Sequence, residues 1–354
     1  MHGRARQFSV RRLRVRLLAV VVGALVTSTA LIASPAKAEE PVYVPWSDLL
    51  PSFTTGYEPS SANDCTSGHV RCVRSVIREM TRRFDPLAAA CNHSSMFALT
   101  YLRTTEQYLE SATAEGFFSD PSFINHQDAV FARYYFDAWD AYRSGDVAGT
   151  SKSWQLAFNA ADGRKVSGLG NLLLGMSAHV NLDLPMVLAE IGLVKPDGSS
   201  RKPDHDKVNQ FLNVVMEPLL DEAAARFDPT VDDGQIDGIT LDETGFLQLL
   251  VGWREMAWRN AEAIVNAPTP AARELVLAEI ERVAAIEANL IIVATSYSSL
   301  NVQAALSALS TLGASSSDIL QAQLDRTVNQ LRGLLGSLFV NGANARDSYC
   351  ASHG

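Results

Sequence analysis

The sequence predicts an all-α protein, organised as a single large multi-helix bundle that is stapled by disulfide bonds. Three observations favour this fold. Apolar residues recur every three or four positions along most of the chain, which is the helical period. Series of short alternating runs bounded by Gly or Asn turns, the pattern of sheet proteins, do not occur. All four cysteines follow an N-terminal segment typical of exported proteins, which indicates disulfide bonds.

The first 38 residues have the three parts of a secretory signal. Six arginines lie among the first 16 residues, an apolar run covers 17–33, and Ala36-Lys37-Ala38 is a small-residue cleavage site. A membrane anchor is the alternative, but the run is shorter than the roughly 20 residues that span a bilayer. No later stretch has the length and apolar composition of an anchor. We therefore predict cleavage after Ala38 and a secreted, extracellular protein without a stable membrane anchor.

The charge of the mature chain limits the class of partner. The signal holds seven of the 30 basic residues and none of the 39 acidic ones, so 23 basic residues remain and the net charge is near −16. A surface this acidic repels nucleic acid and anionic lipid at long range. We therefore expect no nucleic-acid partner, whereas a small-molecule or lipid-like substrate is compatible with the composition.

Two disulfide bonds are expected from the cysteines that follow the signal, which are Cys65, Cys72, Cys91 and Cys350. Four cysteines allow three connectivities. We favour Cys65–Cys72, which closes a short loop, and Cys91–Cys350, which ties the C-terminal tail to the first helices. Free buried thiols are the alternative, and an oxidising compartment disfavours them.

The predicted elements follow the signal in order. An irregular lead-in covers 39–69, and one helical domain covers 70–354 with a possible sub-boundary near 228–242. We expect Pro185 to end its helix and Asp204 to cap the next one. The expected helices cover about 70–84, 94–115, 127–143, a short segment around Trp154 and Phe158, 168–184, 204–227 and a segment around 246–256, followed by an Ala-, Leu- and Ile-rich region to about 339.

One helix places two polar side chains on an apolar face. At helical pitch His179 and Asp183 fall on the same line as Leu172 and Met176. A metal ion could accept both groups, since a neutral imidazole and an ionised carboxylate are ordinary zinc ligands. The alternative is a hydrogen bond between His179 and Asp183, or bonds to nearby backbone. Spacing alone favours this second interpretation.

Further histidines lie near the starts of other predicted helices. His205 follows Asp204 and falls in line with the apolar Val208, while His126 and Asp128 lie at the start of the helix expected at about 127–143. Helix ends often gather at one side of a bundle. The sequence thus predicts a possible metal site of His126, His179, Asp183 and His205, with Asp128 or His126 as a base on metal-bound water.

The run Gly175-Met176-Ser177-Ala178-His179-Val180-Asn181-Leu182-Asp183-Leu184-Pro185 carries a resemblance. Together with 204–209 and 131–154, it resembles the bacterial family catalogued as domain of unknown function 5995. The likeness covers roughly 78–262. It implies a helical domain and no assigned activity.

The same residues are more distantly similar to the zinc-dependent phospholipase C and single-strand nuclease superfamily, which are helical exported hydrolases with a three-zinc site. His179 and Asp183 match the first pair of that family's ligands, and His205 matches the first half of the second pair. Asn209 stands where the next acid belongs. The resemblance therefore implies a site with one or two metals, or none, rather than a complete three-zinc cluster.

Two functions are compatible with these residues. The first is a secreted metal-dependent phosphoester hydrolase of phospholipase C type, with zinc held by His179, Asp183 and His205. The second is a non-catalytic exported protein that binds a ligand or a cell-wall component, in which His179 and Asp183 form a satisfied polar pair in the core.

Overall fold

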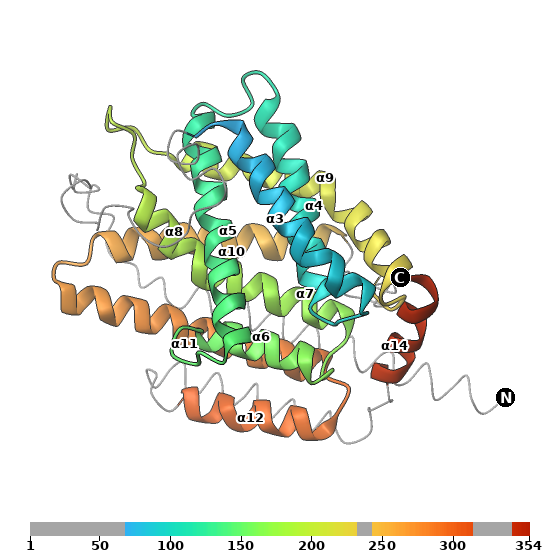
Figure 1. Ribbon diagram of the computed structural model, residues 1–354. Helices are drawn as coiled ribbons and strands as arrows, with labels where there is room; N and C mark the ends of the chain where they lie inside the picture. Colours follow the sequence, from blue (N-terminus) through green and yellow to red (C-terminus); the bar gives the residue numbers. More distant parts are fainter. Residues whose placement is uncertain (1–67, 232–242, 314–341) are drawn as a thin grey trace.

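The computed structural model describes residues 68–231, 243–313 and 342–354, and confirms an all-α fold (Figure 1). This part of the chain contains no strand, and its extended pairing is confined to two isolated bridges, Val166 to Ser296 and Val194 to Ser200. The predicted signal, most of the lead-in, and most of the loop at 228–242 lie outside the described residues.

The helices are α3 (Val70–Ala89), α4 (Ser95–Thr113), α5 (Pro121–Ser144), α6 (Lys152–Asp162), α7 (Gly168–Ser177), the π-helix η2 (Ala178–Asp183), α8 (Leu184–Ile191), α9 (Lys202–Arg226), α10 (Glu243–Val265), α11 (Pro270–Thr295), α12 (Ser299–Gly313) and α14 (Gly342–His353).

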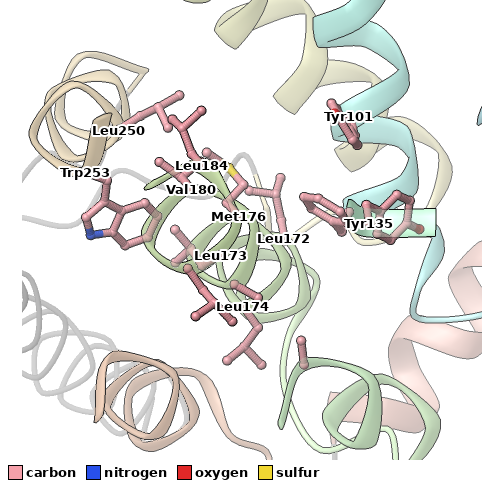
Figure 2. Packing of buried hydrophobic residues seen from close by; sticks show 14 of the residues in the cluster. Tyr101, Tyr135, Leu172, Leu173, Leu174, Met176, Val180, Leu184, Leu250 and Trp253 are labelled. Carbon is pink, nitrogen blue, oxygen red and sulfur yellow. The ribbon is translucent and has the colours of Figure 1, made fainter. Parts of the chain in front are cut away.

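The continuous helix formed by α7, η2 and α8 lies in the middle of the bundle. It packs against α4, α5, α6, α10 and α11. Figure 2 shows it with Leu250 and Trp253 of α10 on one side and Tyr101 and Tyr135 on the other. Apolar side chains from all of these helices join one hydrophobic cluster. Every residue from Gly168 to Ala178 except Leu169 is buried, which explains why this segment is apolar on all faces.

The prediction that Pro185 ends this helix is wrong. The chain passes through η2 and continues as α8, in which Pro185 occupies the first turn. Proline lacks a backbone N–H, but the first turn of a helix tolerates that loss, and a wide π-helical turn replaces regular bonding just before it. The π-helical turn contains His179 and Asp183, so the irregular part of the helix carries the polar pair.

The expectation of no further apolar stretch of membrane-spanning length is also wrong. The segment Gly168–Ile191 is long and apolar enough to cross a membrane, but nearly all of it is buried inside the protein. Its apolar character therefore serves the core of the bundle.

Asp204 does not cap its helix, contrary to the prediction. Helix α9 begins earlier, at Lys202, and its N-cap makes no side-chain hydrogen bond. The buried carboxylate of Asp204 instead accepts hydrogen bonds from the backbone N–H groups of Ser119 and Asp120, at 2.8 Å each, and from the Ser119 hydroxyl at 2.7 Å. Asp204 thus fixes the turn between α4 and α5.

The C-terminal helix α14 is fastened to the start of the domain. The Cys91–Cys350 disulfide is present, as predicted. The buried Arg346 reinforces it by donating to Asn171 Oδ1 at 2.7 Å. Figure 1 shows α14 beside the C-terminal end of α9. Cys65 lies outside the described residues, so the second predicted bond stays a prediction.

Candidate functional site

A cavity of about 110 Å³ lies between α4, α5, α9, α10 and the η2 region. Most of its lining is aromatic or aliphatic. Its hydroxyls are largely satisfied within the protein, since Thr100 and Thr105 donate to carbonyls of their own helix and Tyr108 donates to Asn125. The lining residues are Phe97, Thr100, Tyr101, Thr104, Thr105, Tyr108, Ile124, Gln127, Asp128, Phe131, Met176, His179, Val180, Leu184, Val208, Phe211, Leu212, Met216, Leu250 and Arg254.

Three polar atoms of this lining have no hydrogen-bond partner among the described residues. They are Gln127 Oε1, Asp128 Oδ2 and His179 Nε2. Buried polar atoms are nearly always paired, because each unpaired one costs about 1–3 kcal/mol. Three such atoms on one cavity can therefore pair with water or with a bound molecule.

His179 is held in a fixed orientation. Its Nδ1–H donates to Asp183 Oδ2 at 2.8 Å, and the same oxygen accepts the Trp154 indole N–H at 2.9 Å. Two N–H donors on one oxygen assign the imidazole proton to Nδ1 and leave a lone pair on Nε2. The Phe131 ring lies parallel to the imidazole, and Tyr101 meets it edge-on.

Burial disfavours the charged form of both groups. Loss of solvent holds the pKa of His179 well below 6.5 and the pKa of Asp183 well above its usual range, although the Trp154 hydrogen bond opposes the second shift. The sequence alone left open whether the pair binds a metal or is internally bonded. The structure shows the internal hydrogen bond, and it leaves one nitrogen of His179 unused.

A second titratable group of the cavity is Asp128 on α5. Burial raises the pKa of its carboxyl to about 8, so this group is mostly protonated at neutral pH. Asp128 lies three residues before Phe131, on the same face of α5, and Phe131 stacks on His179. The neighbouring Gln127 also lines the cavity. These side chains form the polar end of the site on the α5 side.

His205 lies against Arg254 of α10 rather than at His179. Its Nε2–H donates to the Arg254 backbone carbonyl at 3.1 Å, and its own carbonyl accepts Arg254 Nη2 at 2.5 Å. The Arg254 Nε–H donates to Asn209 Oδ1 at 2.8 Å. Asn209 stands where the resemblance placed an acid, and its side chain binds Arg254. Burial and the arginine charge hold the pKa of His205 well below 6.5.

The four predicted metal ligands are not gathered into one group. His179 and Asp183 are in contact, His205 is occupied by Arg254, and the half-buried His126 on α5 does not line the cavity. No set of three or more His, Cys, Asp or Glu side chains in the described segments is arranged to hold a metal ion. These residues as placed do not fit zinc as a set, and zinc binding stays a prediction.

Sequence reasoning missed three residues of this region, Trp154, Gln127 and Arg254. Arg254 carried a detectable signal, because it interrupts the apolar positions of a helix that continues on both sides of it. Trp154 was identified as helical, but its hydrogen bond to Asp183 depends on how α6 packs against η2, which no local pattern reveals.

No curated protein and no solved structure matches the chain. The distant likeness to the zinc-dependent phospholipase C and nuclease superfamily has no support from these comparisons. A family model described as a family of unknown function, DUF5995, matches residues 73–294. That range runs from the first turn of α3 to the last turn of α11 and contains every lining residue of the cavity. Since the match covers more than half of the sequence, the chain belongs to this family.

Proposed function

We propose that this protein binds a small, mostly apolar molecule in the cavity between α4, α5, α9 and α10. The observation that carries the proposal is the combination of an apolar wall with three unpartnered polar atoms. Binding sites for small molecules typically consist of such a wall and a few convergent polar groups. This corresponds to the non-catalytic, ligand-binding alternative that the sequence raised.

The volume and the exposure of the lining both support entry of a ligand. An apolar cavity of about 150 Å³ in another protein binds benzene, so about 110 Å³ is of the same order. Thr104 of α4, Phe131 of α5 and Val208 of α9 are half-buried, whereas most of the lining is buried. The entrance therefore lies where α4, α5 and α9 meet.

Isothermal titration calorimetry with 2-phenylethanol tests this function. We expect a Kd on the order of 1 mM or tighter for a ligand of this size. Thr104→Phe places a ring in the cavity and should weaken binding about tenfold or more. Thr113→Phe is the matched control, because Thr113 is exposed on the same helix and does not line the cavity. Equal binding by wild type and Thr104→Phe would contradict the proposal.

Hydrolysis is a second candidate function, favoured by the Asp183–His179 pair. A histidine whose Nδ1–H is held by a carboxylate presents Nε2 as a proton acceptor, which is how a general base is arranged. The zinc-dependent form of this hypothesis is tested by metal analysis of the purified protein. Stoichiometric zinc that disappears in His179→Ala supports a metalloenzyme, whereas a metal-free wild type contradicts it.

We also propose that the protein is exported. The Cys91–Cys350 bond supports this, because stable disulfides form in oxidising compartments. N-terminal sequencing of the protein recovered from the medium should begin at Glu39. Recovery of the full-length chain from the cytoplasm, with its cysteines reduced, would contradict export.

A further inference from the structure

Arg254 is a buried charge at the wall of the cavity. Arg254 is only 6% exposed. It lines the cavity together with Leu250, which lies one turn earlier on α10. A buried charged group is costly unless an opposite charge or a set of hydrogen bonds compensates it. The partners of this guanidinium therefore decide what the cavity can accept.

The partners of Arg254 within the described part of the chain are all uncharged. Its Nε–H donates to the Asn209 amide oxygen, and Nη2 donates to the His205 carbonyl. The neutral His205 ring holds Nδ1 at 3.4 Å from Nη2, which is a weak acceptor contact. Nη1 takes part in none of these bonds. The guanidinium is thus fixed in place by neutral acceptors, and one of its nitrogens stays available.

Two acids near Arg254 are engaged elsewhere: Asp206, whose charge acts on the guanidinium, and Glu255, the next residue in the chain. Asp206 and Glu255 both accept from Lys202, at 2.9 and 2.6 Å, and Glu255 also accepts from Arg259. Burial lowers the pKa of Arg254 to about 10, and this effect outweighs the opposing attraction of the Asp206 charge. The buried Arg346 differs, since it lies 3.9 Å from the Asp228 carboxylate.

We propose that the ligand is a monoanion, such as a carboxylic acid with an apolar body, whose anionic group binds Arg254. This inference rests on the proposed function and specifies its ligand class. The apolar body lies along Leu250, Val208 and Leu212, which line the same cavity. The Nη1 group can donate a charge-assisted hydrogen bond to a carboxylate, and an anion here supplies the counter-charge that the described hydrogen-bond partners of Arg254 do not provide.

An acid in the lining of the same cavity gives the competing ligand class. Asp128 with its unpartnered Oδ2 lies among aromatic rings and could bind an amine instead. Asp128 is, however, held mostly protonated at neutral pH, whereas Arg254 is fully charged. The charge present in the cavity at pH 7 is therefore positive, and it favours an acid over an amine.

Three probes of the same shape test the ligand class by calorimetry at pH 7: phenylacetate, 2-phenylethanol and 2-phenylethylamine. We expect phenylacetate to bind about tenfold or more tightly than the alcohol, because a hydrogen bond to a charged group adds that much affinity. The amine should bind most weakly. Equal binding of acid and alcohol, or tightest binding of the amine, overturns the inference and leaves the proposed function intact. If none of the three binds, the proposed function fails as well.

A variant then assigns the preference to Arg254. Arg254→Gln should reduce phenylacetate affinity about tenfold and leave 2-phenylethanol affinity within about twofold, which also shows that the cavity is intact. Arg259→Gln is the matched control, because it removes the same charge from an exposed position of the same helix. If Arg254→Gln retains the acid preference, the inference is overturned. The comparison of the three probes on wild type needs no variant, so it stands even if Arg254→Gln folds poorly.

Discussion

The rings of Phe131 and His179 lie face to face, with centroids 3.5 Å apart and planes 5° from parallel. This contact seals one side of the imidazole from water and contributes to its low pKa. We expect the imidazole of His179 to titrate well below pH 6.5. The measurement is an NMR titration of the imidazole Cε1–H, assigned by its loss in His179→Gln. A midpoint near 6.5 would show that solvent reaches the ring.

The buried histidines make the fold sensitive to acid. Burial lowers the pKa of His93 to about 4, and it holds the pKa values of His179 and His205 well below 6.5. The unfolded chain therefore binds more protons than the folded chain below pH 6.5, so these groups destabilise the fold as the pH falls toward 4. Denaturant midpoints should shift less with acid in His205→Gln than in wild type. An equal acid shift in both proteins contradicts this account.

Asp128 has the opposite effect on the pH dependence of stability, because its pKa is raised by burial. Its folded-state pKa of about 8 exceeds the unfolded value near 3.8, so the folded protein binds the extra proton and loses stability as the pH rises between these values. Asp128→Asn removes this titration. Wild type should therefore lose free energy of unfolding relative to the variant from pH 5 to pH 8, by at most about 1.4 kcal/mol per pH unit. A constant difference across this range would show that Asp128 is ionised throughout.

The close approach of α4 to α7 depends on Gly175. A Cβ at this position would lie 2.2 Å from Cγ of Phe97, whose ring packs near His179. Gly175→Ala should therefore destabilise the protein by about 1–3 kcal/mol through overpacking. Gly252→Ala is the matched control, since no atom lies within 4 Å of that Cβ, and it should stabilise α10 by about 0.5–1 kcal/mol. Thermal unfolding measures both, and equal effects would contradict the contact.

The Cys91–Cys350 bond closes a loop with a sequence separation of 259 residues. Long loops lose the most chain entropy when they are closed, so replacing both cysteines by Ala should cost about 2–5 kcal/mol. Urea unfolding under oxidising conditions measures this. The variant Arg346→Gln, measured with the disulfide intact, gives the contribution of the polar contacts of α14 to stability apart from that of the disulfide. A double Ala variant as stable as wild type would indicate that those contacts alone hold the helix.

The fold class was predictable because helical periodicity is a local property of the sequence. The predicted starts at 70 and 168 agree with α3 and α7, since the apolar pattern begins there. Pro185 was misinterpreted because its effect depends on the π-helical turn before it. The role of Asp204 was missed because its hydrogen-bond donors lie about 85 residues away, in the turn between α4 and α5.

The site was predictable in part. The spacing of His179 and Asp183 correctly placed both on a buried face, and their hydrogen bond was one of the two interpretations considered. The grouping of His205 with them was not supported, because the position of a helix start around a bundle depends on packing with α10. Arg254 stands out because the nearby acids bind Lys202 and leave the guanidinium with neutral partners. These contacts depend on the packing of α9 against α10, which the linear sequence does not display.

The bond between Cys91 and Cys350 also sets an order of events in biogenesis. Every residue from 92 to 349 must be synthesised before this cross-link can form. The cavity walls between α4 and α10 are all encoded within that interval, so the whole chamber is translated before the chain can be covalently closed around it.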